Sequence, residues 1–111
     1  MNAEKLALLE EIFRPLALPY PHESKLLILS AVDTIEFQKR CQAQGLMLLG
    51  MDAFIHHPDG TIQPTLQYST DYTHTDKLWI PPQERYKLAH EHLSLAEVQH
   101  LYFESVFETR D

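Results

Sequence analysis

The sequence predicts an α+β fold, a small and mainly antiparallel sheet of three or four strands with helices packed on it. The first observation is a β-hairpin pattern over residues 45–72, in which two runs of aliphatic, aromatic and β-branched residues flank the pair Asp59-Gly60. Glycine adopts the positive φ that a tight turn requires, so this pair predicts the chain reversal. The second observation is a set of helical patterns on both sides of the hairpin. At 111 residues one core suffices, and we expect a single globular domain over residues 1–111.

The two arms of the hairpin differ in polarity. Residues 46–49 are almost wholly apolar, which is typical of a strand at the centre of a sheet, whereas residues 66–72 alternate as in a strand with one wet face. Pro64 has no N–H to donate to a ladder, so it predicts an edge or a bulge in the second arm. Gly50 predicts a bend that directs the Asp52 carboxylate away from the core.

The first part of the chain predicts a helix over residues 3–13, capped by Asn2. Its expected core-facing stripe consists of Ala3, Leu6, Leu9, Ile12, Phe13 and Leu16. Three prolines make residues 14–21 an extended connector, because proline fixes φ and removes a donor. Residues 25–29 are either a short buried strand or the start of a helix, and their length favours a strand.

A second helix is predicted over residues 34–44, directly before the hairpin. Asp33 and Glu36 have the spacing of a capping box, and Gly45 stands where a C′ glycine ends a helix. Helix and hairpin therefore follow each other without a linker, and we expect the helix to pack across the sheet.

The last part of the chain predicts an irregular segment and two helices. Residues 73–82 are irregular, with Trp79 as an anchor into the core or a surface groove. A short helix over residues 83–92 follows Pro82, which suits a first helical turn. A second capping-box pattern at residues 94–97 predicts a final helix, whose apolar face consists of Leu95, Val98, Leu101, Tyr102 and Val106.

The charge balance argues against two classes of partner. Nine Lys and Arg against 16 Asp and Glu give a net charge of −7, whereas nucleic acid and anionic membranes bind basic surfaces. Such a charge suits a cationic protein partner, although plain solubility also explains it. With no signal-peptide pattern and no apolar run near the length of a membrane span, we expect a cytoplasmic protein.

No cofactor or metal site is predicted. The adjacent His56 and His57 would point to opposite sides of a strand, and His90 and His92 would diverge on a helix. Cys41 is the only cysteine and lies within a predicted helix, which favours a structural thiol over a nucleophile. The sequence also has no glycine-rich phosphate loop.

The carboxylates of the hairpin region carry the functional expectations. Asp52 and Asp71 could form a pair for general acid–base catalysis if the hairpin brings them together, but an exposed polar strand end explains them more simply. Acids beside tyrosines could instead bind Lys or Arg of a partner, and half-buried core tyrosines are the equally weighted alternative. The candidate partner-binding residues are Asp52, Asp59, Tyr68, Asp71, Tyr72, Asp76 and Trp79.

About residues 25–75 also resemble a known family. The similarity is to small α+β immunity proteins of bacterial polymorphic-toxin systems, and it rests on Leu49-Gly50-Met51-Asp52-Ala53-Phe54, Asp59-Gly60-Thr61-Ile62-Gln63-Pro64 and Tyr68-Ser69-Thr70-Asp71-Tyr72. The resemblance implies a cytoplasmic, non-enzymatic protein that binds and blocks a cognate toxin domain, and it does not identify the toxin. The acidic face of the hairpin suits a toxin with a basic active-site cleft, such as a nuclease. The alternatives are a small enzyme using Asp52 and Asp71, and a regulatory or scaffold subunit.

Overall fold

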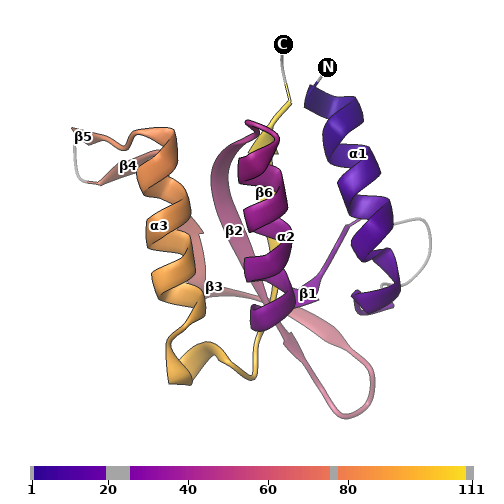
Figure 1. Ribbon diagram of the computed structural model, residues 1–111. Coiled ribbons are helices and arrows are strands. Elements are labelled where there is room, and N and C mark those ends of the chain that lie inside the picture. The colour runs from indigo at the N-terminus through magenta and orange to yellow at the C-terminus, as the bar shows by residue number, and fades with distance from the viewer. Residues whose placement is uncertain (1, 20–25, 76–77, 110–111) are drawn as a thin grey trace.

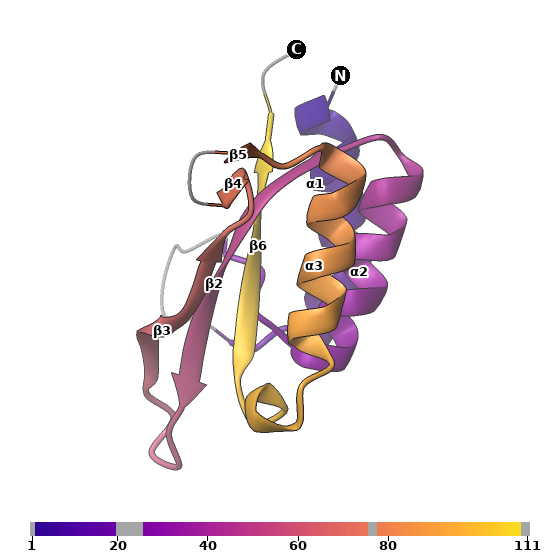
Figure 2. The same cartoon turned by 90° about the vertical axis from the view of Figure 1, so that its left-hand side faces the viewer.

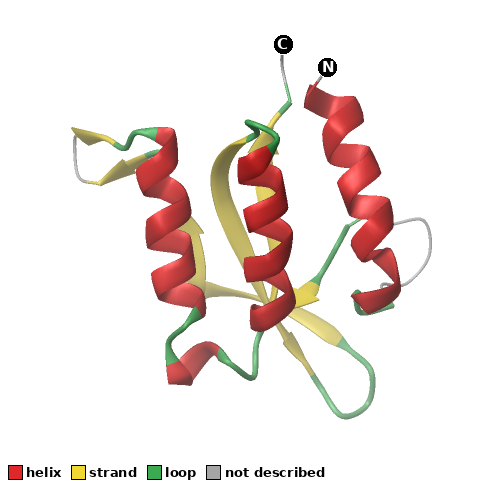
Figure 3. Cartoon of the chain, viewed as in Figure 1, coloured by secondary structure: helices red, strands yellow, loops and turns green. Residues whose placement is uncertain are grey.

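The computed structural model describes residues 2–19, 26–75 and 78–109 and places three α-helices on one face of a four-stranded antiparallel sheet (Figures 1 and 2). The strand order is β1-β6-β2-β3, and β4 and β5 form a separate small hairpin. The predicted α+β class is therefore confirmed. The elements, coloured by type in Figure 3, are α1 (Asn2–Phe13), β1 (Leu29–Ser30), α2 (Ala31–Ala43), β2 (Met47–His56), β3 (Ile62–Asp71), β4 (His74–Thr75), β5 (Leu78–Trp79), α3 (Pro82–Leu93) and β6 (Tyr102–Glu108), with 3-10 turns at Arg14–Leu16 and Ala96–Val98.

The predicted hairpin is formed by β2 and β3. Gly60 has a φ of +91°, and the Thr61 N–H donates to Asp59 Oδ1 over 2.9 Å, so the turn lies where the sequence places it. β2 lies between β6 and β3, which confirms that the apolar first arm is central. β3 is an edge strand, and this position tolerates Pro64 because an edge N–H needs no ladder partner.

Two irregularities bend the hairpin. The register between β2 and β6 shifts between Leu48 and Gly50, which confirms the expected bend at Gly50. Between β2 and β3, Met51 pairs with Thr70 but Ala53 pairs with Thr65, so residues 66–69 stand opposite Asp52 alone. The Ser69 hydroxyl closes this bulge, because it donates to the Thr65 carbonyl and accepts from the Ala53 N–H, each over 3.0 Å. The bulge fixes how the end of β3 approaches β2.

The core lies between the helices and the sheet. Phe37 of α2 is at its centre, with its ring centre 5.2 Å from that of Phe13 and 6.0 Å from that of Phe107, both in edge contact. Cys41 is fully buried beside them, and burial raises the pKa of its thiol to about 12. A thiol with so high a pKa is unreactive, which agrees with the structural role expected for it.

The predicted last helix is wrong. Only the single 3-10 turn Ala96–Val98 forms from the capping-box pattern, and residues 102–108 form strand β6 instead. Phe103 and Phe107 are buried on the helix side, while Tyr102 and Val106 alternate with them on the other side. β6 fills the slot between β1 and β2, so it gains ladder hydrogen bonds on both edges that a helix at this place would forgo.

The second helix starts earlier than predicted. Its N-cap is Ser30, whose hydroxyl accepts from the Asp33 N–H over 3.2 Å, so Asp33 belongs to the first turn. The strand expected over residues 25–29 is reduced to β1, and Lys25 lies outside the described residues. Gly45 ends the helix with a φ of +76°, as predicted.

The first helix has the predicted extent but buries less than expected. Phe13 is its buried residue, whereas Ile12 and Leu16 of the predicted stripe are exposed. These side chains are exposed because α1 lies at the end of the row of helices and has a neighbouring helix, α2, on one side only (Figure 1). No helix in the described ranges is long and apolar enough to cross a lipid bilayer.

Candidate functional site

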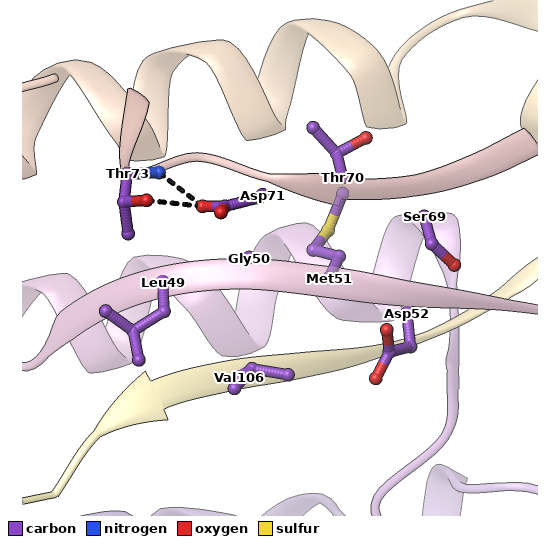
Figure 4. Close-up of a pocket in the computed structure, with 9 residues that line it drawn as sticks. All are labelled: Leu49, Gly50, Met51, Asp52, Ser69, Thr70, Asp71, Thr73 and Val106. Atoms are coloured by element: carbon purple, nitrogen blue, oxygen red, sulfur yellow. Dashed lines mark hydrogen bonds between the residues drawn. The ribbon is translucent and has the colours of Figure 1, made fainter. Parts of the chain in front are cut away.

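An open cavity of about 400 Å³ lies where β2, β3 and β6 meet, at the end of β3 (Figure 4). The helices lie behind these strands in the close-up, so the cavity opens on the sheet face that the three α-helices leave uncovered. We call this face the open face. The cavity is lined by Leu49, Gly50, Met51, Asp52, Ser69, Thr70, Asp71, Thr73 and Val106.

Gly50 forms the floor of the cavity. It pairs with Asp71 of β3 on one side and with Val106 of β6 on the other, and Figure 4 shows it between these two side chains. A Cβ atom at this position would stand 2.5 Å from the Thr70 carbonyl oxygen, which is closer than such atoms approach in proteins. Only glycine therefore allows β3 to lie this close to β2 at the cavity.

Asp71 stands on the β3 side of the cavity and is held in one orientation. Its Oδ1 accepts from the Thr73 hydroxyl over 2.6 Å and from the Thr73 N–H over 2.8 Å (Figure 4). These hydrogen bonds, together with the nearby His74 and Arg85, keep the pKa of Asp71 below its usual value. The carboxylate is exposed and stays ionised at neutral pH.

Asp52 stands on the β6 side of the cavity and is exposed, as predicted. Its direct partner across the β2–β6 ladder is Glu104, so two carboxyl groups face each other on the open face. No lysine or arginine in the described ranges forms an ion pair with Asp52, Asp71 or Glu104. Acids in this arrangement are available to an external cation.

Glu104 is the site residue that sequence reasoning missed. It lies in the segment for which the sequence predicts the last helix, although the two-residue alternation of Tyr102, Glu104 and Val106 with Phe103 and Phe107 is a strand signal. Partial burial and, to a smaller extent, the negative charges of Asp52 and Glu10 together raise the pKa of Glu104 to about 7. Near neutral pH this carboxyl is therefore divided between its protonated and ionised forms.

The Glu104 pKa predicts a stability that depends on pH. Between the ordinary pKa of 4.5 and about 7, the folded chain keeps a proton that the unfolded chain has released. The contribution of this group is thus complete below about pH 4.5 and is lost as the pH rises through about 7. We expect Glu104→Gln to stabilise the protein by about 1–2 kcal/mol at pH 8 and to change little near pH 4, after allowing for the partial exposure of the side chain.

Urea unfolding of parent and variant at both pH values measures this effect. Glu91→Gln, at an exposed position of α3, is the control and should show no such pH-dependent gain. A Glu104→Gln variant no more stable than the parent at pH 8 would mean that ionising the partly buried Glu104 beside Asp52 costs the folded state nothing.

Several of the other predicted partner-binding residues are not among those that line the cavity. Asp59 is exposed in the β2–β3 turn, at the opposite end of β3 (Figure 1). Tyr68 lies in the bulge and is half-buried against the core. Trp79 is exposed on β5, so it does not anchor into the core. Asp76 lies outside the described residues.

Tyr72, another of the predicted partner-binding residues, is a core residue in this structure. Tyr72 is 1% exposed and belongs to the core, so it offers no area to another molecule. The Tyr72 hydroxyl is hydrogen-bonded to His92 Nδ1 over 2.5 Å, and burial raises the pKa of Tyr72 to about 12. The residue lies one position past β3, where the alternation turns its side chain toward the helices.

The cavity combines apolar side chains with a few polar ones, and its charged side chains are both carboxylates. Two carboxylates and three hydroxyl side chains line it, and the lining contains no cationic side chain, cysteine or histidine. In the part of the chain that the structure describes, no three or more His, Cys, Asp or Glu side chains are grouped to hold a metal ion. Comparison of the chain with protein-family models, with curated proteins and with solved structures gives no match.

Proposed function

We propose that this chain is a cytoplasmic, non-enzymatic immunity protein that binds and neutralises a cognate toxin through the acidic cavity on the open face. One observation carries the proposal. Asp52 and Asp71, from different strands, line one cavity without an ion-pair partner in the described ranges, and Glu104 faces Asp52 beside it. Such a site favours the ammonium or guanidinium groups of a partner's Lys and Arg.

Charge indicates which partner fits. A net charge of −7 and a cavity whose charged side chains are both carboxylates favour a protein with a basic surface and disfavour a nucleic-acid backbone. A nuclease toxin has such a surface, because its active-site cleft must attract phosphates. The cavity segments 49–52 and 69–71 also lie within the region that resembles immunity proteins, which supports this class of partner.

Catalysis by the same carboxylates is the weaker candidate. General acid–base catalysis needs a group whose pKa lies near the working pH and which reaches the substrate. Asp71 has a lowered pKa, and Glu104, whose pKa is about 7, does not line the cavity. The Ser69 hydroxyl is engaged in the bulge. The lining therefore favours binding.

The test uses the protein encoded by the reading frame adjacent to this gene. We expect expression of this adjacent protein alone to arrest growth, and its co-expression with the present chain to restore growth. We also expect the two purified proteins to form a stable complex. If the adjacent product is harmless, or if it neither binds nor is neutralised, the proposal fails. A regulatory or scaffold subunit that binds a housekeeping protein would give that negative result.

Salt dependence tests whether the acids steer the encounter. At about 0.01 M ionic strength, fields reach roughly 30 Å, whereas at 0.15 M they are screened within about 8 Å. We expect the association rate with the adjacent product to fall about tenfold or more across this range, while the dissociation rate changes less. Stopped-flow mixing measures both rates. An association rate that does not change with ionic strength would mean that the acids do not steer the encounter.

A further inference from the structure

The small β4–β5 hairpin exposes two large apolar side chains. Leu78 is 73% exposed and Trp79, the single tryptophan of the chain, is 58% exposed. They are consecutive on β5, at the end of α3 in Figure 1. Successive residues of a strand point to opposite sides, so Leu78 and Trp79 do not form one patch. Trp79 is the stronger candidate for a binding contact, because tryptophan is among the residues most enriched in the contacts that dominate binding energy.

Trp79 is held in place from beneath by Arg85. The Arg85 guanidinium carbon lies 5.2 Å from the centre of the indole ring, in cation–π geometry. Arg85 is itself 2% exposed and fixed by two backbone acceptors, since its Nε donates to the Ile80 carbonyl over 2.8 Å and its Nη1 to the Leu48 carbonyl over 3.2 Å. The indole is thus pre-ordered, which reduces the entropy lost when a partner covers it.

The hairpin adjoins the acidic cavity. The Ile80 N–H donates to the Thr73 carbonyl over 2.8 Å, and Thr73 is a cavity-lining residue. Arg85 lies near both the hairpin and the cavity. Its guanidinium contacts the Trp79 ring, and its positive charge also favours the ionised form of Asp71. A molecule that places a cation in the cavity therefore has Trp79 at its border.

We propose that Trp79 is the apolar anchor of the toxin-binding surface, and that its occupant is an apolar pocket on the toxin bordered by Lys or Arg side chains. This inference rests on the proposed function and deepens it. Charge complementarity selects the occupant: the neighbouring acids require cations on the partner, and the anchor requires apolar surface directly beside them. The acids would govern the rate of encounter, and the anchor the lifetime of the complex.

The experiment uses the full-length chain and the product of the adjacent reading frame. We expect Trp79→Ala to weaken binding about tenfold or more, mainly through faster dissociation, and Trp79→Phe to weaken it less. Leu8→Ala is the matched control, because Leu8 is also a large exposed apolar residue, 69% exposed, but lies on α1. This control should bind like the parent.

Fluorescence of the unmodified protein gives a second measurement that does not depend on a variant folding. Since Trp79 is the only tryptophan here, a partner without tryptophan, or one labelled with a spectrally distinct analogue, leaves its emission resolved. The anchor predicts a blue shift and reduced quenching by acrylamide in the complex. Normal affinity of Trp79→Ala, or quenching that is unchanged in a complex that does form, would overturn the anchor and leave the proposed function standing. Failure of the parent to bind would overturn both.

Discussion

Gly50→Ala is expected to destabilise the protein by about 3 kcal/mol, because the added methyl group has no room beside β3. The added Cβ would stand 2.5 Å from the Thr70 carbonyl oxygen, and this atom belongs to backbone that cannot rotate away. β3 would have to move outward at the point where it pairs with β2. The same movement would displace Asp71, so binding to the partner should weaken as well. Denaturant unfolding and calorimetric titration measure the two losses.

Gly60→Ala separates this clash from the ordinary effects of replacing glycine. Gly60 has a positive φ but nothing within 4 Å of the added Cβ, so the variant should lose only about 1 kcal/mol from backbone strain. It lies in the turn far from the cavity and should bind normally. Equal stability losses at the two positions would show that β2 and β3 are not so closely apposed at Gly50.

The hairpin could be predicted because its signals are local. The turn is specified by Asp59-Gly60, the edge position by Pro64 and the helix end by Gly45, and each acts within a few residues of itself. The same holds for α3, which begins at Pro82 as expected. These positions did not require knowledge of which distant segments meet.

Strand β6 could not be predicted in the same way because its sequence fits two periods. Leu95, Val98, Leu101 and Tyr102 have helical spacing, whereas residues 102–108 alternate as in a strand. The choice is made by the slot between β1 and β2, and both of these strands are distant in the sequence. Tertiary pairing thus overrides the capping-box signal at Ser94, and Glu104 reaches the open face only as a result.

The cavity itself combines predicted and unpredicted parts. The direction of Asp52 followed from Gly50, but the bulge over residues 66–69, which sets the position of Asp71, has no recognisable signal in the sequence. Tyr72 illustrates the opposite limit. Tyrosine suits a binding surface and a core equally well, and only the register of β3 with β2 assigns it to the core.

Asp71→Asn and Asp59→Asn form a matched test of the binding face, since both acids are exposed and both close a local turn, but only Asp71 lines the cavity. Each is exposed, and each accepts an N–H two residues further along the chain, from Thr73 over 2.8 Å and from Thr61 over 2.9 Å. Asparagine keeps the side-chain shape at both sites and removes one negative charge. Stability losses from the local turn should therefore be similar.

Affinity should not be similar. We expect Asp71→Asn, like Asp52→Asn, to weaken binding of the adjacent product by about 2 kcal/mol, or roughly 30-fold in Kd, because a cation of the partner loses its direct acceptor. Asp59→Asn should change Kd by less than about threefold, since its charge acts only through screened solvent. Calorimetric titration and a melting curve for each variant separate affinity from stability. Equal losses of affinity in Asp71→Asn and Asp59→Asn would mean that only the overall charge of the protein affects binding. Unchanged affinity in Asp52→Asn and Asp71→Asn would place the inhibitory surface outside the open face.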